Sequence, residues 1–241
     1  FSILSFSFSF PVFTGCASLG EALAGAAQVI SVVIADAAVA AAEAAAPHLS
    51  AGSFYFDMNS VSPGAKQAAA RAITAAGGHY VDTAVMAPVN PQRLAVPLLL
   101  AGPEADAGQV RLAALGFSNI HIVGSDIGRA ATIKMLRSVL FKGMEALTAE
   151  CLLACDRAGV TDEVVASFGA GFAEQADYRF DRMLVHGTRR AAEMVEAAKT
   201  LTELGIEPLL TRGTIARQAD LGGRGHAPPP AGLAAKLEAL R

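Results

Sequence analysis

The feature that most constrains the fold is the alternation of short apolar runs with alanine-rich segments between residues 18 and 124. Strands are predicted over 28–36, 52–60, 79–85, 95–102 and 119–124, and helices over 18–26, 37–49, 62–78 and 103–116. This alternation, with short connections, is typical of a largely parallel sheet covered by helices. Ligands bind such sheets at the carboxyl ends of the strands. The polar residues predicted at these ends are Asp36, Asp57, Asn59, Ser60 and Asp82.

Two of the predicted helices carry clear start signals. Ser18 precedes Glu21 by three residues, which is the spacing of a capping box. Pro63 stands in the first turn of the helix predicted over 62–78, and a Gly-Gly pair ends that helix.

No strand-like run of any length follows Gly124. Helices are predicted over 130–159, 161–172, 180–205 and 214–222, followed by a flexible Gly/Pro-rich linker over 222–232 and a short terminal helix. The first of these helices is long enough to be the central helix of a helical domain. The predicted fold class is therefore α/β: an incomplete Rossmann-like domain with a mostly parallel sheet over 18–125, then an all-α C-terminal domain over 126–241.

Residues 1–17 form an atypical leader that begins without Met and alternates Phe and Ser. We favour a truncated or foreign leader. The alternation also has the period of an edge strand. A targeting segment is the third alternative, but a signal peptide needs a positively charged start, and the first Lys or Arg is Lys66.

The composition of the chain argues against nucleic acid and membrane as partners. The chain has 241 residues, a net charge of −3 and no Lys/Arg-rich block, so it lacks the electrostatic footprint of a nucleic-acid-binding protein. The alanine-rich stretch is interrupted by Asp36, Glu43 and His48, so no membrane span is predicted. Three scattered cysteines suit a reducing compartment, and we expect a cytoplasmic protein with neither nucleic acid nor membrane as a partner.

One lysine, Lys134, lies in the otherwise apolar start of the long predicted helix, in the segment GRAATIKMLRS. Ser138 lies four residues on, which puts it on the same helix face, and Arg137 lies beside them. A lone helical lysine most often extends its amine to water. Lys134, however, follows the predicted domain junction, where clefts form, and a lysine held there can act as a general acid or base.

Four segments together resemble a known family. FDMNSVSPGAKQ, GGHYVDTAVMAPV, PLLLAGPE and GSDIGRAATIKMLRS occur in the order and spacing of the β-hydroxyacid dehydrogenases, which include 3-hydroxyisobutyrate dehydrogenase and relatives of 6-phosphogluconate dehydrogenase. The resemblance covers most of the chain, residues 18–225. Each segment alone is a weak motif, and the ordered set is more specific.

The resemblance implies oxidation of an alcohol β to a carboxylate, or the reverse reduction, with NAD or NADP as cofactor. It implies that Lys134 is the catalytic lysine and that Asn59 and Ser60 lie near nicotinamide and substrate. The residues that it places along the cofactor's ribose are Val33, Ile34, Ala35 and Asp36. It also implies a homodimer formed through the helical domain, with a small hydroxy acid as substrate.

The sequence departs from the family at the predicted substrate site. Met86, Ala87 and Pro88 stand where the family carries Ser-Gly-Gly, and Pro88 has no N–H to donate. Ser138 stands for the usual asparagine, and Phe141 for the glutamate of phosphogluconate enzymes. We therefore do not expect decarboxylation of 6-phosphogluconate, while Met86, Ala87 and Ser138 remain predicted substrate-binding positions.

Arg137 is predicted to hold the substrate carboxylate, because a guanidinium pairs a carboxylate through two parallel hydrogen bonds. Replacing Arg137 with alanine is expected to raise KM for an acidic substrate severalfold or more, as read from steady-state kinetics. Unchanged kinetics on a clearly acidic substrate would remove Arg137 from the site.

The family opens with a strand and a G-x-G-x-x-G turn that holds the cofactor's diphosphate at a helix N-terminus. GCASLG at 15–20 keeps only the two outer glycines, so we expect the first βαβ unit to be missing from this chain and cofactor binding to be impaired. Two functions stay open: an active dehydrogenase, or a truncated, inactive remnant that acts as a structural or dimerising protein. Titration with NADH and NADPH separates them.

Overall fold

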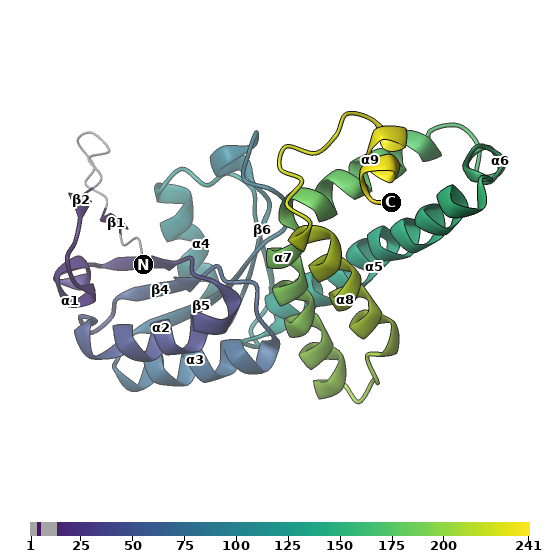
Figure 1. Cartoon of the computed structure of the whole chain (residues 1–241). Coiled ribbons are helices and arrows are strands. Elements are labelled where there is room, and N and C mark those ends of the chain that lie inside the picture. The colour runs from purple at the N-terminus through teal and green to yellow at the C-terminus, as the bar shows by residue number, and fades with distance from the viewer. Residues whose placement is uncertain (1–3, 6–13) are drawn as a thin grey trace. The chain divides into compact units, whose positions relative to one another are not determined.

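The computed structural model describes residues 4–5 and 14–241. The chain packs as two compact units, the first ending at Met135 and the second running from Leu136 to Arg241 (Figure 1). The first unit holds a five-stranded sheet with helices, and the second is helical. The predicted fold class is therefore confirmed. The leader predicted over 1–17 lies mostly outside the described residues. In its described part, β1 (Leu4–Ser5) pairs antiparallel with β2 (Thr14–Gly15).

The sheet runs in the order β3-β4-β5-β6-β7. Its strands are β3 (Gln28–Ser31), β4 (Phe54–Asp57), β5 (His79–Val85), β6 (Leu98–Ala101) and β7 (Ile120–Gly124). The first three are parallel, β6 is antiparallel to β5, and β7 is parallel to β6. The strand predicted over 28–36 is therefore shorter than expected. Its apolar continuation leaves the sheet as a loop, in which Val32 and Ile34 are exposed.

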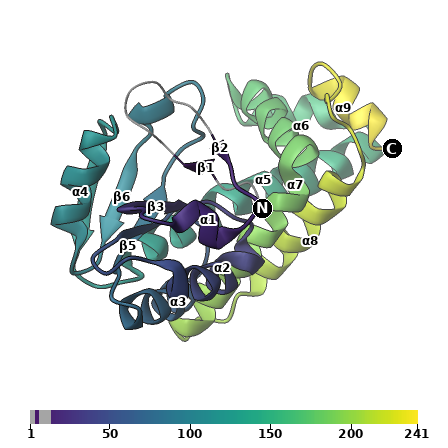
Figure 2. The same ribbon diagram turned by 90° about the vertical axis from the view of Figure 1, so that its left-hand side faces the viewer.

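Helices cover both faces of this sheet (Figure 2). One face is covered by α1 (Leu19–Leu23), α2 (Ala38–Ala45) and α3 (Pro63–Ala75), and the other by α4 (Ala105–Ala114). Neighbouring strand residues alternate between the two cores: Tyr55 and Tyr80 pack under α2 and α3, whereas Phe54 and Phe56 pack with α4. This alternation is the side-chain period of a strand buried on both faces.

The predicted helix starts are confirmed. Ser18 Oγ accepts a hydrogen bond from the Glu21 amide at 3.2 Å, and Glu21 Oε2 accepts one from the Ala17 amide at 2.8 Å. Pro63 opens α3, where Ser62 Oγ accepts from the Ala65 amide at 3.3 Å. The bonds to the Glu21 and Ala65 amides satisfy donors that a helix leaves without an internal partner.

Five helices make up the rest of the chain, and the first of them begins in the first unit. They are α5 (Arg129–Ala158), α6 (Thr161–Ser167), α7 (Phe172–Glu203), α8 (Leu209–Gly223) and α9 (Leu233–Ala239). The helix predicted over 161–172 ends early because Gly169 and Gly171 adopt positive φ angles of 82° and 85°, which break the helix. α7 then begins directly after Gly171, at Phe172, which is earlier than the predicted residue 180.

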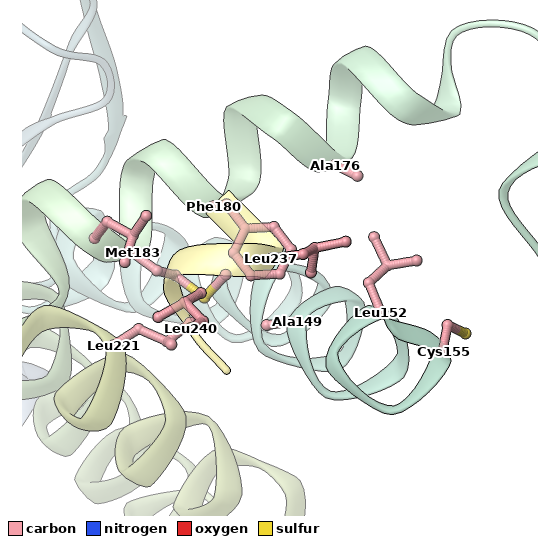
Figure 3. Packing of buried hydrophobic residues seen from close by; sticks show 10 residues of the cluster. Ala149, Leu152, Cys155, Ala176, Phe180, Met183, Leu221, Leu237 and Leu240 are labelled. Carbon is pink, nitrogen blue, oxygen red and sulfur yellow. The ribbon is translucent and has the colours of Figure 1, made fainter. Parts of the chain in front are cut away.

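The helical unit has its own apolar core (Figure 3). Phe180 and Met183 of α7, Leu152 of α5 and Leu237 of α9 are all almost fully buried in one cluster. The apolar side chains of the short terminal helix thus anchor it in the core of the helical unit. No helix within the described residues is long and apolar enough to cross a membrane.

Two glycines allow α7 and α8 to approach closely. A Cβ on Gly187 would lie 2.3 Å from the Gln218 carbonyl oxygen, and a Cβ on Gly222 would lie 2.3 Å from the Thr188 nitrogen. Both distances are far shorter than a van der Waals contact. The neighbouring atoms belong to the backbone, so they cannot rotate away as the end of a side chain can. Glycine is therefore required at this helix crossing.

Candidate active site

A lysine–serine pair lies at the carboxyl end of β4. Lys134, in the second turn of α5, donates a hydrogen bond from Nζ to Ser60 Oγ at 2.6 Å, and both side chains are half-buried. An ammonium group has donors only, so Ser60 Oγ is the acceptor and its own hydrogen points to another group. The structure thus brings together two predicted site residues that are 74 positions apart in the sequence.

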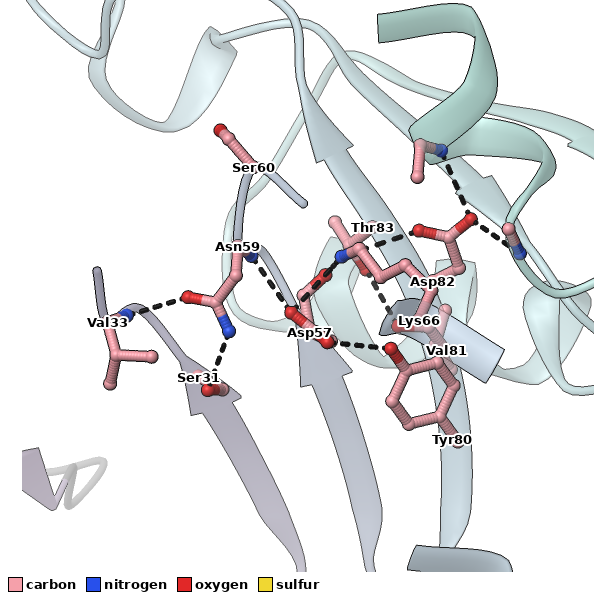
Figure 4. A network of polar contacts seen from close by, with 12 residues as sticks. Ser31, Val33, Asp57, Asn59, Ser60, Lys66, Tyr80, Val81, Asp82 and Thr83 are labelled. Carbon is pink, nitrogen blue, oxygen red and sulfur yellow. Dashed lines mark hydrogen bonds and ion pairs between the residues drawn. The ribbon is translucent and has the colours of Figure 1, made fainter. Parts of the chain in front are cut away.

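The side chain of Asn59 links the carboxyl ends of the neighbouring strands β3 and β4 (Figure 4). Its Oδ1 accepts from the Val33 amide at 2.6 Å, and its Nδ2 donates to Ser31 Oγ at 3.0 Å. With a side chain that is almost completely buried, Asn59 holds the loop after β3 against the loop after β4. Its position next to Ser60 therefore fixes the loop that carries the serine of the lysine–serine pair.

Two carboxylates share one buried ammonium group behind this loop. The sheet register places Asp57 directly opposite Asp82, and the Lys66 side chain from α3 lies between them. Lys66 Nζ lies 3.1 Å from Asp57 Oδ1 and 3.4 Å from Asp82 Oδ1 and also donates to the Asp57 carbonyl at 2.5 Å. All three residues are fully buried, and without Lys66 two like charges would face each other inside the protein.

Asp82 also caps the start of α5. Its Oδ2 accepts from the Gly128 amide at 3.0 Å and from the Ala131 amide at 3.2 Å. A carboxylate at a helix N-terminus is stabilised by these amides and by the helix dipole. Burial nevertheless raises the pKa of Asp82, against the opposing effect of the Lys66 charge.

Lys66, Ser31 and Tyr80 were not predicted as members of the site. The tyrosine hydroxyl donates to Asp57 Oδ2 at 2.6 Å, so the network reaches the core under α3. The sequence signal that could have indicated a buried ion pair is an acidic residue in each of two adjacent predicted strands, with a lysine in the first turns of the helix between them.

Burial also changes the ionisation of two phenols near this network. It raises the pKa of Tyr55 to about 12, where a hydrogen bond from Ser31 opposes the shift and the Asp57 charge adds to it. Burial and the same charge raise the pKa of Tyr80 well above its usual value. Both phenols are therefore protonated in the folded protein at pH values that ionise the tyrosines of an unfolded chain.

We expect the folded state to lose stability in alkaline solution because of these two tyrosines. Their contribution is complete below about pH 10, where free tyrosine ionises, and is lost as the pH rises towards the raised values. In a Tyr178→Phe chain, Tyr55 and Tyr80 are the only tyrosines, and absorbance at 295 nm should report their ionisation together with unfolding. Reversible ionisation of both near pH 10 in a folded chain would contradict this prediction.

The other predicted site residues of the first unit follow β3 and β5 in the chain. In the loop after β3, Ile34 and Asp36 are exposed and Val33 and Ala35 half-buried. Met86 packs against Ala84, Ala101 and Ala130, and its amide donates to the Pro97 carbonyl at 2.9 Å. Ala87 packs in the core beneath α4. The side chains of both predicted substrate-binding residues on this loop thus pack against apolar residues.

Arg137 and Ser138 belong to the second unit. The Arg137 guanidinium lies over the Phe141 ring, 4.3 Å from its centre, and Ser138 Oγ accepts from Lys142 Nζ at 3.2 Å. Lys142 also pairs with Glu193 at 2.8 Å, and burial lowers the pKa of this lysine. The substrate-binding roles of Arg137 and Ser138 stay predictions.

The fold and the strand-end residues define a class of protein: a Rossmann-like α/β domain followed by a helical domain. A family model described as a domain of unknown function (DUF1932) matches residues 156–221. An uncharacterized 28.5 kDa protein from Methanothermus fervidus is 26% identical over 164 residues, which are 66% of this chain and 62% of that protein. The match thus spans less than two thirds of this relative's length.

Solved structures extend the comparison. A conserved hypothetical protein from Sinorhizobium meliloti is 37% identical, with a TM-score of 0.75 over 93% of this chain and 77% of that one. A conserved protein of unknown function, described as structurally similar to 3-hydroxyacid dehydrogenases, is 31% identical, with a TM-score of 0.67 over 86% and 79%. Mycobacterium tuberculosis 3-hydroxyisobutyrate dehydrogenase, described with L-serine, shares the fold at 16% identity, with a TM-score of 0.65 over 94% and 83%.

These similarities identify the family. The chain belongs to the β-hydroxyacid dehydrogenase-like proteins, the family that the sequence segments predicted.

Proposed function

We propose that this protein is an NAD(P)-dependent oxidoreductase that acts on the CH–OH group of a small hydroxy acid. The observation that carries the proposal is the 2.6 Å hydrogen bond from Lys134 Nζ to Ser60 Oγ at the carboxyl end of β4. That end of the strand is where α/β sheets bind ligands. The family's dehydrogenase relatives supply the reaction class, and the pair supplies a group able to transfer a proton.

The residues at the strand ends suit the ring portion of a dinucleotide. Val32 and Ile34 expose 71% and 72% of their surface in the loop after β3, and the bond from the Val33 amide to Asn59 fixes that loop. Exposed apolar side chains beside oriented polar groups suit a flat heteroaromatic ring. We therefore propose Val33, Ile34, Ala35, Asp36 and Asn59 as the residues that contact NAD or NADP. NAD or NADP held by these residues would supply hydride-transfer chemistry.

Lys134 carries the accompanying proton transfer. In alcohol oxidation the neutral amine accepts the hydroxyl proton at Nζ, and in reduction the ammonium returns a proton to the carbonyl oxygen. Because Ser60 Oγ accepts from Lys134, the Ser60 hydroxyl hydrogen can be donated to a substrate oxygen. The two residues would then orient the reacting oxygen from two sides.

A titration decides between this function and an inactive chain. NADH and NADPH are added up to millimolar concentration while fluorescence and thermal unfolding are followed. We expect stabilisation by at least one of them, and turnover on a panel of β-hydroxy acids that includes 3-hydroxyisobutyrate and L-serine. The absence of stabilisation by either cofactor would overturn the dehydrogenase proposal and favour a structural role for this chain.

We also propose that the helical unit forms a homodimer. On α5, Leu136, Leu140, Met144 and Leu147 follow one another at helical spacing and are all exposed. A contiguous apolar stripe of this kind is typical of an interaction surface. Light scattering should give twice the mass of the chain, and a monomer at micromolar concentration would refute this assembly.

A further inference from the structure

We infer that Lys66 is a positioning residue that holds the lysine–serine pair together from behind. This inference rests on the proposed function, because it assigns Lys66 a role in the same site. Lys66 touches neither Lys134 nor Ser60 in any bond described above. It contacts the two carboxylates that fix the two segments on which these residues stand.

The first connection runs through Asp57 to the loop that carries Ser60. Asp57 Oδ1, which pairs with Lys66, also accepts from the Asn59 amide at 2.9 Å. Lys66 Nζ in addition binds the Asp57 carbonyl, so it holds both the backbone and the side chain of the last residue of β4. Asn59 and Ser60 follow within three residues.

The second connection runs through Asp82 to the helix that carries Lys134. Asp82 Oδ1 lies 3.4 Å from Lys66 Nζ, while Oδ2 accepts from Gly128 and Ala131. Lys134 is one turn beyond Ala131. One ammonium group thus sets the positions of both partners in the Lys134–Ser60 hydrogen bond.

Stability alone does not account for this arrangement. Burying one cation with two carboxylates costs desolvation energy, and apolar side chains of similar volume commonly stabilise a core as well or better. Asp82 is fully buried, so its carboxylate is shielded from water, and this burial raises its pKa. Lys66 makes directional bonds that align the loop after β4 with the start of α5, and apolar packing could not supply such bonds.

The test uses Lys66→Met in the full chain, with Arg71→Met as the matched control. Arg71 is an exposed cation on the same helix, so its loss removes a charge without touching the network. Hydrogen exchange is measured at the Asn59 and Ala131 amides, and kcat is measured separately from KM for the cofactor.

For Lys66→Met we expect about tenfold faster exchange at both amides, together with a fall in kcat of about tenfold or more and little change in the cofactor KM. Arg71→Met should leave all three readouts unchanged. A folded Lys66→Met chain with wild-type exchange and wild-type kcat would overturn the inference. Faster exchange with an unchanged kcat would also overturn it, since Lys66 would then have only a structural role.

A variant that does not fold and a protein that has no dehydrogenase activity lead to different conclusions. If Lys66→Met does not fold, the double variant Lys66→Met/Asp82→Asn leaves only one unpaired buried carboxylate instead of two, and the same changes at Asn59 and in kcat are expected. If the unmodified protein shows no dehydrogenase activity, the proposed function fails. Hydrogen exchange then still decides whether Lys66 links the two segments, and wild-type exchange in the variant would refute that link.

Discussion

Replacing Lys134 with methionine is expected to lower kcat by about 10²- to 10⁴-fold, because proton transfer by a positioned side chain contributes that much to a reaction rate. Methionine keeps the length of the side chain and removes the amine. Cofactor binding should be unchanged, since Lys134 is assigned to the proton and not to the dinucleotide. Initial rates on the best substrate of the hydroxy-acid panel, together with cofactor titration, measure both effects.

Lys199→Met is the control for the loss of a lysine, because Lys199 is exposed and pairs with Glu196 on α7. It should leave the rate unchanged. Added methylamine should restore part of the activity of Lys134→Ala by supplying the missing amine. A Lys134→Met chain with a rate within threefold of the unmodified protein would contradict the assignment of this residue as acid and base.

The second large effect is on stability. Replacing Gly222 with alanine is expected to lower the free energy of unfolding by about 3 kcal/mol, the upper end of the usual cost of overpacking. The added Cβ would lie 2.3 Å from the Thr188 nitrogen, so α7 and α8 would have to move apart. Urea unfolding of the full chain measures the change.

Gly213→Ala is the matched control on the same helix. An added Cβ at Gly213 meets nothing within 4 Å, so this variant should be slightly more stable, by about 1 kcal/mol, through the better helix propensity of alanine. If the two variants have the same stability, the close approach of the helices does not limit substitution at Gly222.

Where start and stop signals lie in the neighbouring residues, the sequence predicted the bounds of helices and strands accurately. The strand predicted over 79–85 matches β5 residue for residue, and α3 begins at Pro63 with Ser62 as its cap. The apolar run after Gln28 misled the prediction of β3, because a run of this kind has the same composition in a buried strand and in an exposed loop. The reversed direction of β6 depends on its pairing with β5, for which no local pattern exists.

The residues of the candidate site were predictable only where the sequence resembles a known family. Lys134, Asn59 and Ser60 were found through ordered segments, whereas the bond between Lys134 and Ser60 joins residues 74 positions apart. The role of Lys66 depends on the register that places Asp57 opposite Asp82. Register is set by the packing of whole strands, so a buried ion pair of this kind cannot be located from neighbouring residues in the sequence.

The cap that Asp82 forms on α5 has a consequence for anion selectivity. The first amides of a long helix normally attract phosphate groups. Here the amides of Gly128 and Ala131 already bind a carboxylate that belongs to the protein itself. The start of α5 thus carries an internal counter-ion, which opposes the binding of a phosphate group at these two amides. In the proposed reaction, Lys134, one turn further along α5, would then meet the substrate without an external anion bound at the amides beneath it.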